Sequence, residues 1–583
     1  MLQTNSLLPQ MNKPKTILIG GKAGEGVKKA AQVIAALLCQ NGYHVFQQDD
    51  YQSLIKGGHN FSGVSFAEEP VHTGYQKADL IVSLDKRSLQ THINDCNSGA
   101  IHCFNSDDCL QTMDQDSSVT LLGYPLNAMM KEVYSKPSNV SMAALAICFA
   151  WLGYSEELLC DTIAKEFKRD VEDNIRYAKE VFKLCHPDFL STNLSIPQNS
   201  IPLLPGARLL SGNQAIAQGA WLAGLDFYYA YPMTPASSIL HYLALKQQTY
   251  KTFAIHAESE LAAANMAIGS VFAGARTAIG SSGGGFALMQ EAFSLAGMAE
   301  APLLCIVSSR PGPATGVSTY TAQEDLMFAL YQGHGEFGRI VASPDSAARA
   351  LTLTAELLSL AWEFQSPVIL LTDKHLSESS ADVAVSQVVE SCSLPDEPNL
   401  TESTDTYNRY EFTDNGVSPL RFPGSDFGDD SLMIKWNSHE HHPSGLRTDS
   451  SESIKAMKDK RNLKSRGLQE ATKNYQRIAV YGDSGPVVYA YGSTVLELRE
   501  AAKHCSYKFR IVALIYLLPL AIDDLQDYIR DEAIVVEHSS TGTLATYLQQ
   551  NLTLKIKKSI LHYDGRPFDP IELALLIEEA IDA

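Results

Sequence analysis

The sequence has no closely spaced pair of cysteines. Its ten cysteines are scattered along 583 residues, and no two of them are separated by only two residues. Zinc ribbons and the usual iron–sulfur sites need such spacings, so we expect no metal cluster on this chain. Cys103 and Cys109 are the nearest pair, and we interpret them as ordinary buried thiols in a reducing cytosol.

Basic residues are few relative to acidic ones. The chain has 46 Lys and Arg against 66 Asp and Glu, which gives a formal net charge of -20. Nucleic-acid binding needs a basic surface, so this balance argues against a nucleic-acid partner. An anionic ligand must then be held by a few local cations and by helix N-termini, which act against the overall field.

Long apolar runs are also missing. The longest run, Met142–Leu152, is shorter than the roughly 20 residues that cross a bilayer. Residues 1–15 contain no sustained apolar stretch. We therefore predict a soluble, cytoplasmic protein without a membrane segment.

The length and composition of the chain predict several α/β domains. With 583 residues, 45% of them hydrophobic and 19% charged, about three folded cores are expected. After a flexible N-terminus at 1–15, an apolar run, a glycine-rich turn at 20–26 and a helical period open a Rossmann-like domain, 16–186. A Pro-, Ser- and Asn-rich linker follows at 187–208. Within the first domain, strands are expected at 78–84, 100–104 and 119–122, and helices at 141–152 and from 156.

A second domain, 209–393, alternates apolar runs with helical periods, which is typical of a doubly wound, mostly parallel sheet. A polar inter-domain segment follows at 394–475, and we interpret its charged, helix-prone piece at 453–466 as a surface hairpin or lid. A third α/β domain is predicted over 476–583. The strands expected in the second domain are 226–230, 252–256, 276–280, 303–308 and 368–372.

Four segments of the second domain follow predicted strands and carry reactive side chains. The first is Tyr-Pro-Met-Thr-Pro at 231–235, and the second is His-Ala-Glu-Ser-Glu at 256–260. Ligands of open α/β folds bind at the carboxyl ends of the strands. Taken alone, the first segment is better explained as a proline-shaped turn with Thr234 or Ser237 as a helix cap, and acidic residues in a first turn normally complement the helix dipole.

The third segment is the glycine-rich turn Gly-Ser-Ser-Gly-Gly-Gly-Phe at 280–286, and the fourth is Ser-Arg-Pro-Gly-Pro-Ala-Thr-Gly-Val-Ser-Thr at 309–319. A glycine-rich turn permits close approach of a ligand. The arginine could clamp a carboxylate with two hydrogen bonds, or form only a surface ion pair. All four segments occur in order within one domain, and their combination is more informative than any one of them.

In order and spacing, these segments resemble the α subunits of 2-oxoacid:ferredoxin oxidoreductases, and the 2-oxoglutarate (KorA-like) type in particular. The likeness runs through nearly the whole chain. Segments 331–339, 409–419, 535–542 and 563–568 continue it, the last two as a transketolase C-terminal-like domain. Segments 20–27 and 51–59 resemble the separate γ subunit of these enzymes, so residues 16–186 are expected to be a fused γ-like domain.

The resemblance implies that 209–393 is a pyrimidine-binding domain for thiamine diphosphate. Glu260 would be the catalytic residue that hydrogen-bonds the pyrimidine ring nitrogen and promotes the imino tautomer. Glu258 matches a second acidic position to which we give no catalytic role. The resemblance further implies substrate-binding roles for Thr234, Arg310 and Thr319, and cofactor-binding roles for Tyr231, Pro232, Ser282, Gly283 and Gly285.

The sequence departs from the family at several of these positions. The γ-like turn has Ala23 and Glu25 where Gly and Gln are favoured, and Gly284 stands where proline is usual. The substrate loop contains Gly-Val-Ser-Thr at 316–319 instead of Gly-Leu-Pro-Thr, and Gly-Thr at 542–543 replaces Gly-Gln. These differences affect the predicted substrate more than the predicted fold.

Two parts of such an enzyme are missing from the sequence. No Gly-Asp-Gly segment is present for a magnesium diphosphate, and no cysteines are spaced for an iron–sulfur cluster. The resemblance implies that a β subunit carries both, that coenzyme A accepts the acyl group, and that ferredoxin takes the electrons. Because the chain carries a net charge of -20, we expect an acidic ferredoxin to dock on the β subunit.

The predicted function is thus thiamine-dependent, coenzyme A-linked oxidative decarboxylation of a 2-oxoacid, with 2-oxoglutarate converted to succinyl-CoA as the favoured reaction. Pyruvate and branched-chain 2-oxoacids remain alternatives, because every 2-oxoacid has the α-carboxylate that Arg310 would bind. A non-catalytic nucleotide-binding scaffold is the alternative from another class. Its support is the glycine turn at 20–26, which lacks the complete Gly-x-Gly-x-x-Gly pattern.

Overall fold

The computed structural model describes residues 13–52, 58–108, 118–134, 140–190, 206–390, 407–423, 434–529 and 532–583. The expected N-terminal tail at 1–15 and linker at 187–208 lie mostly outside these residues. The chain forms two compact units. Unit 1 is Met1–Leu210 with Ser379–Val385, and unit 2 is Ser211–Glu378 with Ser386–Ala583.

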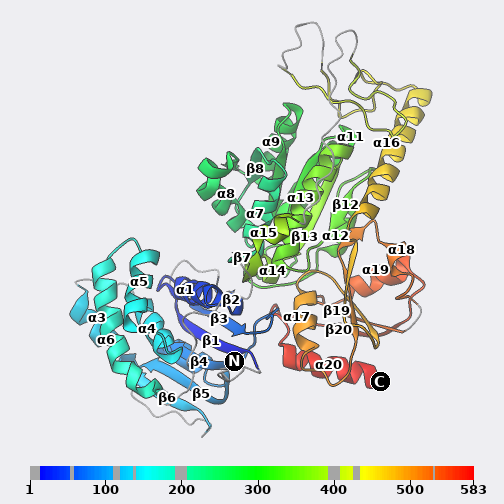
Figure 1. The fold of residues 1–583 in the computed structure, drawn as a ribbon. Coiled ribbons are helices and arrows are strands. Elements are labelled where there is room, and N and C mark those ends of the chain that lie inside the picture. The colour runs from blue at the N-terminus through cyan, green and yellow to red at the C-terminus, as the bar shows by residue number, and fades with distance from the viewer. Residues whose placement is uncertain are drawn as a thin grey trace, which may run out of the picture. The chain divides into compact units, whose positions relative to one another are not determined.

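Unit 1 is built on an eight-stranded mixed sheet with the strand order β6-β5-β4-β1-β3-β2-β14-β7 (Figure 1). Strands β1, β4, β5 and β6 are parallel to one another, as the predicted Rossmann-like arrangement requires. The antiparallel pair β2 and β3 was not predicted. The strands are β1 (Lys15–Lys22), β2 (His44–Asp50), β3 (His59–Ala67), β4 (Ala78–Ser83), β5 (Cys96–Asn105), β6 (Thr120–Tyr124), β7 (Ala207–Ser211) and β14 (Ser380–Ala384).

Helices cover this sheet, and α4 is almost entirely apolar. Every residue of α4 is buried, in keeping with the long apolar run of its sequence, and α4 packs against α6 and α1. The helices are α1 (Val27–Gln40), α2 (Lys86–Thr91), α3 (Leu126–Val133), α4 (Ser141–Trp151), α5 (Glu156–Glu166) and α6 (Val171–Phe189).

Strand β14 comes from residues far along the chain, within the range that the sequence assigned to the second domain. It pairs antiparallel with β2 and lies between β2 and β7 in the sheet. The Asp382 carboxylate accepts hydrogen bonds from His44 Nδ1 and from the main-chain nitrogen of Val45, both at 2.8 Å. The first sheet is therefore completed by a strand that follows most of the second domain in sequence.

Unit 2 contains a seven-stranded sheet with the order β18-β12-β13-β11-β10-β8-β9. All pairs except β12 with β18 are parallel, which confirms the predicted doubly wound fold. Strands β11, β10, β8 and β9 are neighbours, and each precedes one of the four segments singled out in the sequence. The strands are β8 (Phe227–Ala230), β9 (Phe253–His256), β10 (Thr277–Ser281), β11 (Leu303–Ser309), β12 (Ile340–Ala342), β13 (Pro367–Asp373) and β18 (Tyr516–Leu518).

Helices pack on both faces of this sheet (Figure 1). Helices α7 and α13 touch closely because Gly219 has no side chain where Leu351 presents its main-chain oxygen. The helices are α7 (Gly212–Leu222), α8 (Ser237–Tyr250), α9 (Glu260–Phe272), α10 (Gly283–Leu288), α11 (Gln290–Met298), α12 (Leu326–Tyr331), α13 (Ala347–Phe364), α14 (Lys374–Glu378) and α15 (Val385–Glu390).

A five-stranded sheet, β15-β17-β16-β19-β20, forms the C-terminal part of unit 2. It is parallel apart from β15 with β17, and its helices bury an apolar core on the sheet. The elements are β15 (Ile478–Tyr481), β16 (Val487–Ala490), α17 (Thr494–Ala501), β17 (Arg510–Leu514), α18 (Ile522–Leu525), β19 (Ala533–Glu537), α19 (Thr543–Asn551), β20 (Ile556–Leu561) and α20 (Pro570–Asp582).

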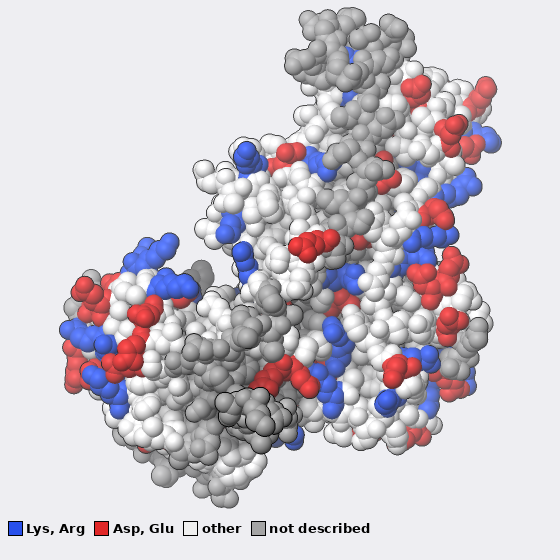
Figure 2. Space-filling model, viewed as in Figure 1, with Lys and Arg blue, Asp and Glu red and all other residues white. Residues whose placement is uncertain are grey.

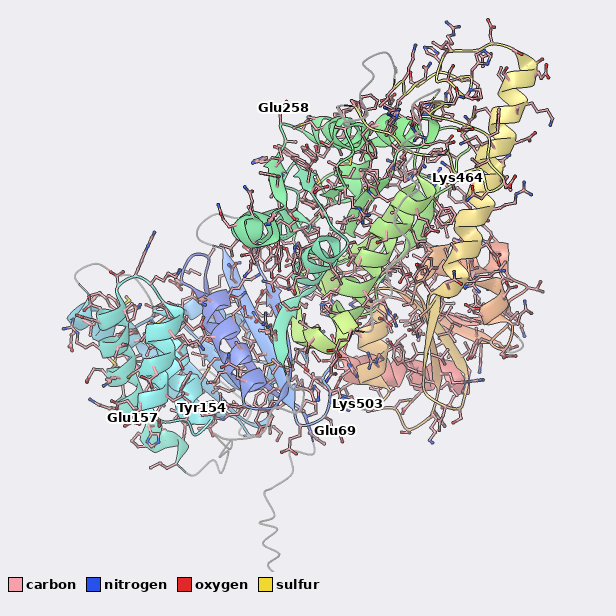
Figure 3. All side chains as sticks on the ribbon, turned by 45° about the horizontal axis from the view of Figure 1, so that its top comes forward. Glu69, Tyr154, Glu157, Glu258, Lys464 and Lys503 are labelled. Atoms are coloured by element: carbon pink, nitrogen blue, oxygen red, sulfur yellow. The ribbon has the colours of Figure 1, made fainter. Side chains whose placement is uncertain are left out.

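The charged piece at 453–466 is a helix and not a hairpin. It is part of one helix, α16 (Ser451–Ala471), and its Lys460 and Lys464 are buried. Both lysines bind the fully buried carboxylate of Glu300, at 2.9 and 2.6 Å. Figure 3 shows Lys464 on the side of α16 that faces α13. The predicted hairpin was wrong, whereas the surface position holds for one side of the helix: the other side is buried, and its lysines pair with Glu300.

The charges that remain exposed are of both signs. In Figure 2, Lys and Arg side chains are interspersed with Asp and Glu over the visible face of the described residues. None of the helices that the structure describes has the length and apolar character needed to cross a membrane.

Candidate functional site

The segment after β8 is joined by side-chain hydrogen bonds to two of the other three segments. The Ser282 hydroxyl, in the glycine turn after β10, donates to Met233 Sδ at 2.6 Å. Arg310, after β11, donates from Nη1 to the main-chain oxygen of Thr234 at 2.7 Å. The structure therefore brings the prolines, the glycine turn and the arginine together at one edge of the sheet.

Glu260 is the first residue of α9 and is almost fully buried, with 4% of its surface exposed. The helix is capped by Ser259, whose hydroxyl accepts from the main-chain nitrogen of Ala262 at 3.2 Å. Glu260 Oε1 is buried and has no hydrogen-bond partner among the described residues. Since an unpaired buried carboxylate oxygen is costly, this atom is a candidate contact for a ligand. Glu258, by contrast, is exposed (Figure 3).

The glycine turn allows this carboxylate to lie against the backbone. A Cβ on Gly285 would overlap Ser281 Oγ and would lie 2.8 Å from Glu260 Oε1. Residues Ser282, Gly283 and Gly285 are buried, whereas Gly284 is exposed. Glycine is therefore required at 285 by close packing around Glu260, and not at 284.

The Arg310 loop is a compact turn. Gly316 has φ +52°, and a Cβ there would overlap the main-chain oxygen of Pro311. That oxygen accepts from the main-chain nitrogen of Val317 at 3.1 Å. Burial lowers the pKa of the half-buried Arg310, and nearby Asp325 acts in the opposite direction. Arg310 remains a cation, and the loop holds it in place.

A cleft of about 190 Å³ opens beside Arg310. Its walls are the first turn of α10, the loop from Arg310 to Ala314, and Asp325. A single cation and a single acid thus face each other in a space large enough for a small organic anion.

Asp325 was not singled out in the sequence. Burial, with a contribution from Glu324, raises the pKa of its carboxyl to about 6, although a hydrogen bond from Ser309 and the charge of Arg310 oppose this. Sequence alone would not mark Asp325 as a site residue, because an Asp before a short helix is usually just a helix cap. Its place beside Arg310 is seen only in the folded chain.

Gln323 is a second residue that the sequence did not indicate. Its main-chain nitrogen donates to the main-chain oxygen of His538 at 2.7 Å. Its side-chain amide donates to the main-chain oxygen of Tyr491 at 2.8 Å. Thr494 donates back to Gln323 Oε1 at 2.9 Å. These bonds attach the end of the Arg310 loop to the C-terminal sheet. No local signal could predict them, because the partners lie more than 150 residues away in sequence.

Not all predicted residues meet at the cleft. Thr319 is buried, with 6% of its surface exposed, but it does not line the cleft. Tyr231 is 40% exposed, and its ring lies 6.1 Å from that of His256. Pro232 is partly buried, and the next residue, Met233, accepts the hydrogen bond from Ser282. Glu260 lies against Gly285, while the cleft is lined by Gly283 and Gly284.

Comparison with known proteins matches this site to a family. The family described as "Pyruvate flavodoxin/ferredoxin oxidoreductase, thiamine diP-bdg" matches residues 218–442, and "Pyruvate ferredoxin/flavodoxin oxidoreductase" matches residues 16–184. A 2-oxoacid:ferredoxin oxidoreductase subunit alpha from Sulfolobus sp is 27% identical over 96% of each chain. A 2-oxoglutarate synthase subunit KorA from Archaeoglobus fulgidus is 38% identical over 30% of this chain and 51% of its own length.

A solved structure has the same fold. The 2-oxoglutarate:ferredoxin oxidoreductase from Magnetococcus marinus, solved with 2-oxoglutarate, coenzyme A and succinyl-CoA bound, superposes with a TM-score of 0.87 at 24% identity. The match covers 98% of this chain and 100% of that one.

The fold and these matches define an oxidoreductase with a thiamine diphosphate-binding domain. The chain belongs to the 2-oxoacid:ferredoxin oxidoreductases, and it matches their α subunits along nearly its whole length. The predicted family and the predicted enzyme class are confirmed, and the non-catalytic scaffold is disfavoured.

Proposed function

We propose that this chain is the α subunit of a heteromeric enzyme that converts 2-oxoglutarate to succinyl-CoA, with thiamine diphosphate as cofactor. The observation that carries the proposal is the buried Glu260 carboxylate, whose Oε1 lacks a hydrogen-bond partner in the described part of the chain. It lies beside a glycine turn that also borders a cleft containing Arg310.

The residues around Glu260 fit the aminopyrimidine of thiamine. A flat ring with a basic nitrogen would satisfy the unpaired Oε1, and the buried position would keep water from competing for that hydrogen bond. The absence of a side chain at Gly285 leaves the room that the carboxylate occupies. When bound, thiamine diphosphate supplies the electron sink that decarboxylation of a 2-oxoacid needs. Glu260 would hold a proton at the ring nitrogen, and Tyr231, Pro232, Ser282, Gly283 and Gly285 would shape the pocket.

The cleft beside Arg310 suits the α-carboxylate of a 2-oxoacid. Arg310 offers a fixed cation whose orientation is set by its bond to the main-chain oxygen of Thr234. A charge-assisted hydrogen bond to a carboxylate is strong in a partly buried site. We assign substrate binding to Arg310, with Thr234 beside it as the residue whose main-chain oxygen holds the guanidinium. Thr319, which does not line the cleft, is not included in this assignment.

The remaining chemistry belongs to partners in this proposal. A β subunit would supply the magnesium diphosphate site and the iron–sulfur cluster, coenzyme A would accept the acyl group, and ferredoxin would accept the electrons. Ferredoxin would dock on the β subunit, because a chain with a net charge of -20 repels an acidic carrier. A tight, salt-insensitive complex between ferredoxin and this chain alone would contradict that assignment.

A broader substrate range is the second candidate. The relative from Sulfolobus is named for 2-oxoacids in general, and the matching family is named for pyruvate. Relatives named for 2-oxoglutarate, from Archaeoglobus fulgidus and Mycobacterium tuberculosis, favour the narrower assignment.

The experiment is to purify the chain with and without a cluster-bearing β partner and to measure coenzyme A-dependent dye reduction. 2-Oxoglutarate, pyruvate and a branched-chain 2-oxoacid would be compared under the same conditions. We expect turnover only in the presence of the partner and a kcat/KM at least about tenfold higher for 2-oxoglutarate, a difference of ~1.4 kcal/mol. Preference for another 2-oxoacid would replace the substrate assignment, and no turnover with any of them would refute the proposed function.

A further inference from the structure

The carboxyl group of Asp325 is turned away from the helix that it precedes. Asp325 is the N-cap residue of α12, yet its side chain makes no capping hydrogen bond. Both carboxyl oxygens instead lie against Gly283, at a position that a Cβ on that glycine would occupy. A cap is the usual reason for Asp at this place, so the side chain must be explained by what it faces.

Asp325 lines the cleft, and one of its carboxyl oxygens is unused. Ser309 hydrogen-bonds the carboxyl group, whereas Oδ2 is buried and has no hydrogen-bond partner in the described residues. The charged and titratable groups that act on Asp325 are Arg310 from the loop after β11, Glu324 beside it in sequence, and Tyr491 from the C-terminal sheet. Arg310 and Asp325 line the same cleft.

We infer that Asp325 is a substrate-positioning residue that donates a hydrogen bond from its protonated carboxyl to the 2-oxoacid held by Arg310. The inference rests on the proposed function, since it takes the cleft to be the 2-oxoacid site.

The chemistry of the ligand requires the proton. A 2-oxoacid offers carboxylate and ketone oxygens, which only accept hydrogen bonds, so an ionised Asp325 would repel it and compete for Arg310. A protonated Asp325 supplies a hydrogen-bond donor for one of these oxygens. Because it is uncharged, it does not compete with the ligand for Arg310. Binding of the 2-oxoacid therefore takes one proton from solvent onto Asp325, and release returns it.

The resting state of Asp325 is compatible with such a change. Burial raises the pKa of the carboxyl to about 6, so Asp325 is mostly ionised at pH 7 to 8 without ligand, and a modest influence of the ligand suffices to protonate it. Each pH unit above the pKa lowers the protonated fraction about tenfold. The apparent affinity for a 2-oxoacid should fall by the same factor.

The test uses the assembled enzyme with its β partner and 2-oxoglutarate as the probe. KM is measured from pH 6 to 8.5 for the wild type, Asp325→Asn and Glu291→Gln, the last being an exposed carboxylate of the same domain. We expect the wild-type and Glu291→Gln KM to rise about tenfold from pH 7 to 8. Asp325→Asn, which always has a donor, should show a flat profile and a KM below that of the wild type at pH 8.

A calorimetric measurement on the wild-type complex, freed of thiamine, tests the inference even if the Asp325→Asn variant does not fold. Binding of 2-oxoglutarate at pH 7.5, compared in buffers of different ionisation enthalpy, should take up close to one proton. Turnover with a pH-independent wild-type KM, parallel profiles for the wild type and Asp325→Asn, or no proton uptake would each overturn the inference while the proposed function stands. Absence of turnover with every 2-oxoacid would overturn both.

Discussion

Arg310 Nη1 donates to the main-chain oxygen of Thr234 at 2.7 Å. These residues follow strands β11 and β8, which are not neighbours, because β10 lies between them. The bond therefore spans the end of β10, where the glycine turn begins, and fixes the guanidinium over the cleft. Arg310, which would bind the substrate, is thus held by the segment after β8, and Thr234 of that segment lies beside the substrate site.

Arg310→Lys should weaken substrate binding without unfolding the chain. Lysine keeps the charge but loses the planar fork that can bond Thr234 and a carboxylate together. Loss of one charged hydrogen bond costs about 1.5–3 kcal/mol, so KM for the 2-oxoacid should rise roughly 10- to 100-fold. The exposed Arg447→Lys is the matched control, and an equal KM in the two variants would remove Arg310 from the substrate site.

Glu260→Gln should abolish most turnover and leave assembly intact. Glutamine has the same shape but cannot hold or release the proton that a pyrimidine nitrogen requires, and loss of such a group typically lowers kcat by at least about 100-fold. Glu258→Gln changes an exposed carboxylate two residues away and should retain activity. Assembly is followed by size-exclusion chromatography with the β partner. Near-normal kcat in Glu260→Gln would contradict the assignment.

Adjacent glycines of the turn should respond differently to alanine. In Gly285→Ala the new Cβ would overlap Ser281 Oγ and crowd Glu260, so the carboxylate must move and kcat should fall at least about tenfold. In Gly284→Ala the Cβ would lie 3.5 Å from the main-chain oxygen of Ala314, an ordinary contact, and kcat should be almost unchanged. Thermal melts of both variants separate displacement from unfolding. Equal kcat values would show that crowding at Glu260 is unimportant.

Removal of the buried carboxylate of Glu300 should destabilise unit 2. Glu300→Gln would leave Lys460, Lys464 and Arg409 close together without their anion. Breaking a buried ion pair in this way costs about 3–5 kcal/mol. Urea unfolding should show a lower midpoint, whereas Lys455→Met, on the exposed side of the same helix, should change it little. An unchanged midpoint in Glu300→Gln would mean that the cluster does not stabilise the fold.

The same cluster predicts sensitivity to acid. Burial disfavours ionisation of Glu300, but Lys464, Lys460 and Arg409 together lower the pKa of its carboxyl well below the ordinary value of 4.5. A carboxyl whose pKa is lower in the folded state stabilises it above the ordinary value, and this contribution is lost as the pH falls. The free energy of unfolding should therefore decrease below about pH 4.5, and less steeply in Glu300→Gln. Parallel pH profiles for the two proteins would refute the linkage.

Much of the fold could be predicted because its signals are local. The apolar runs before residues 231, 257, 282 and 310 indicated four strands, and the structure places them side by side in the sheet. The hairpin of β2 and β3 was missed because its strands contain many polar residues, such as Gln47, Asp49 and Ser62, which are buried against one another.

What could not be predicted depends on contacts between distant residues. The lysines of α16 belong to a charged run that normally indicates a solvated helix face, and their partner Glu300 lies 160 residues away from Lys460. Asp325 has a special position only because Gly283 leaves room for its carboxyl group. Propensity and periodicity describe neither relationship, so both required the folded chain.

Strand β14 has a consequence for how this polypeptide could be divided. It sits in the interior of the first sheet, between β2 and β7, although it is encoded after most of the thiamine-binding domain. A gene cut after residue 210 would yield an N-terminal piece whose β2 has an open edge, with the backbone groups that Asp382 and its neighbours satisfy left to pair with other molecules. The first domain therefore cannot be separated from the rest of the chain by a single cut. A split version would have to carry residues 379–385 together with residues 1–210.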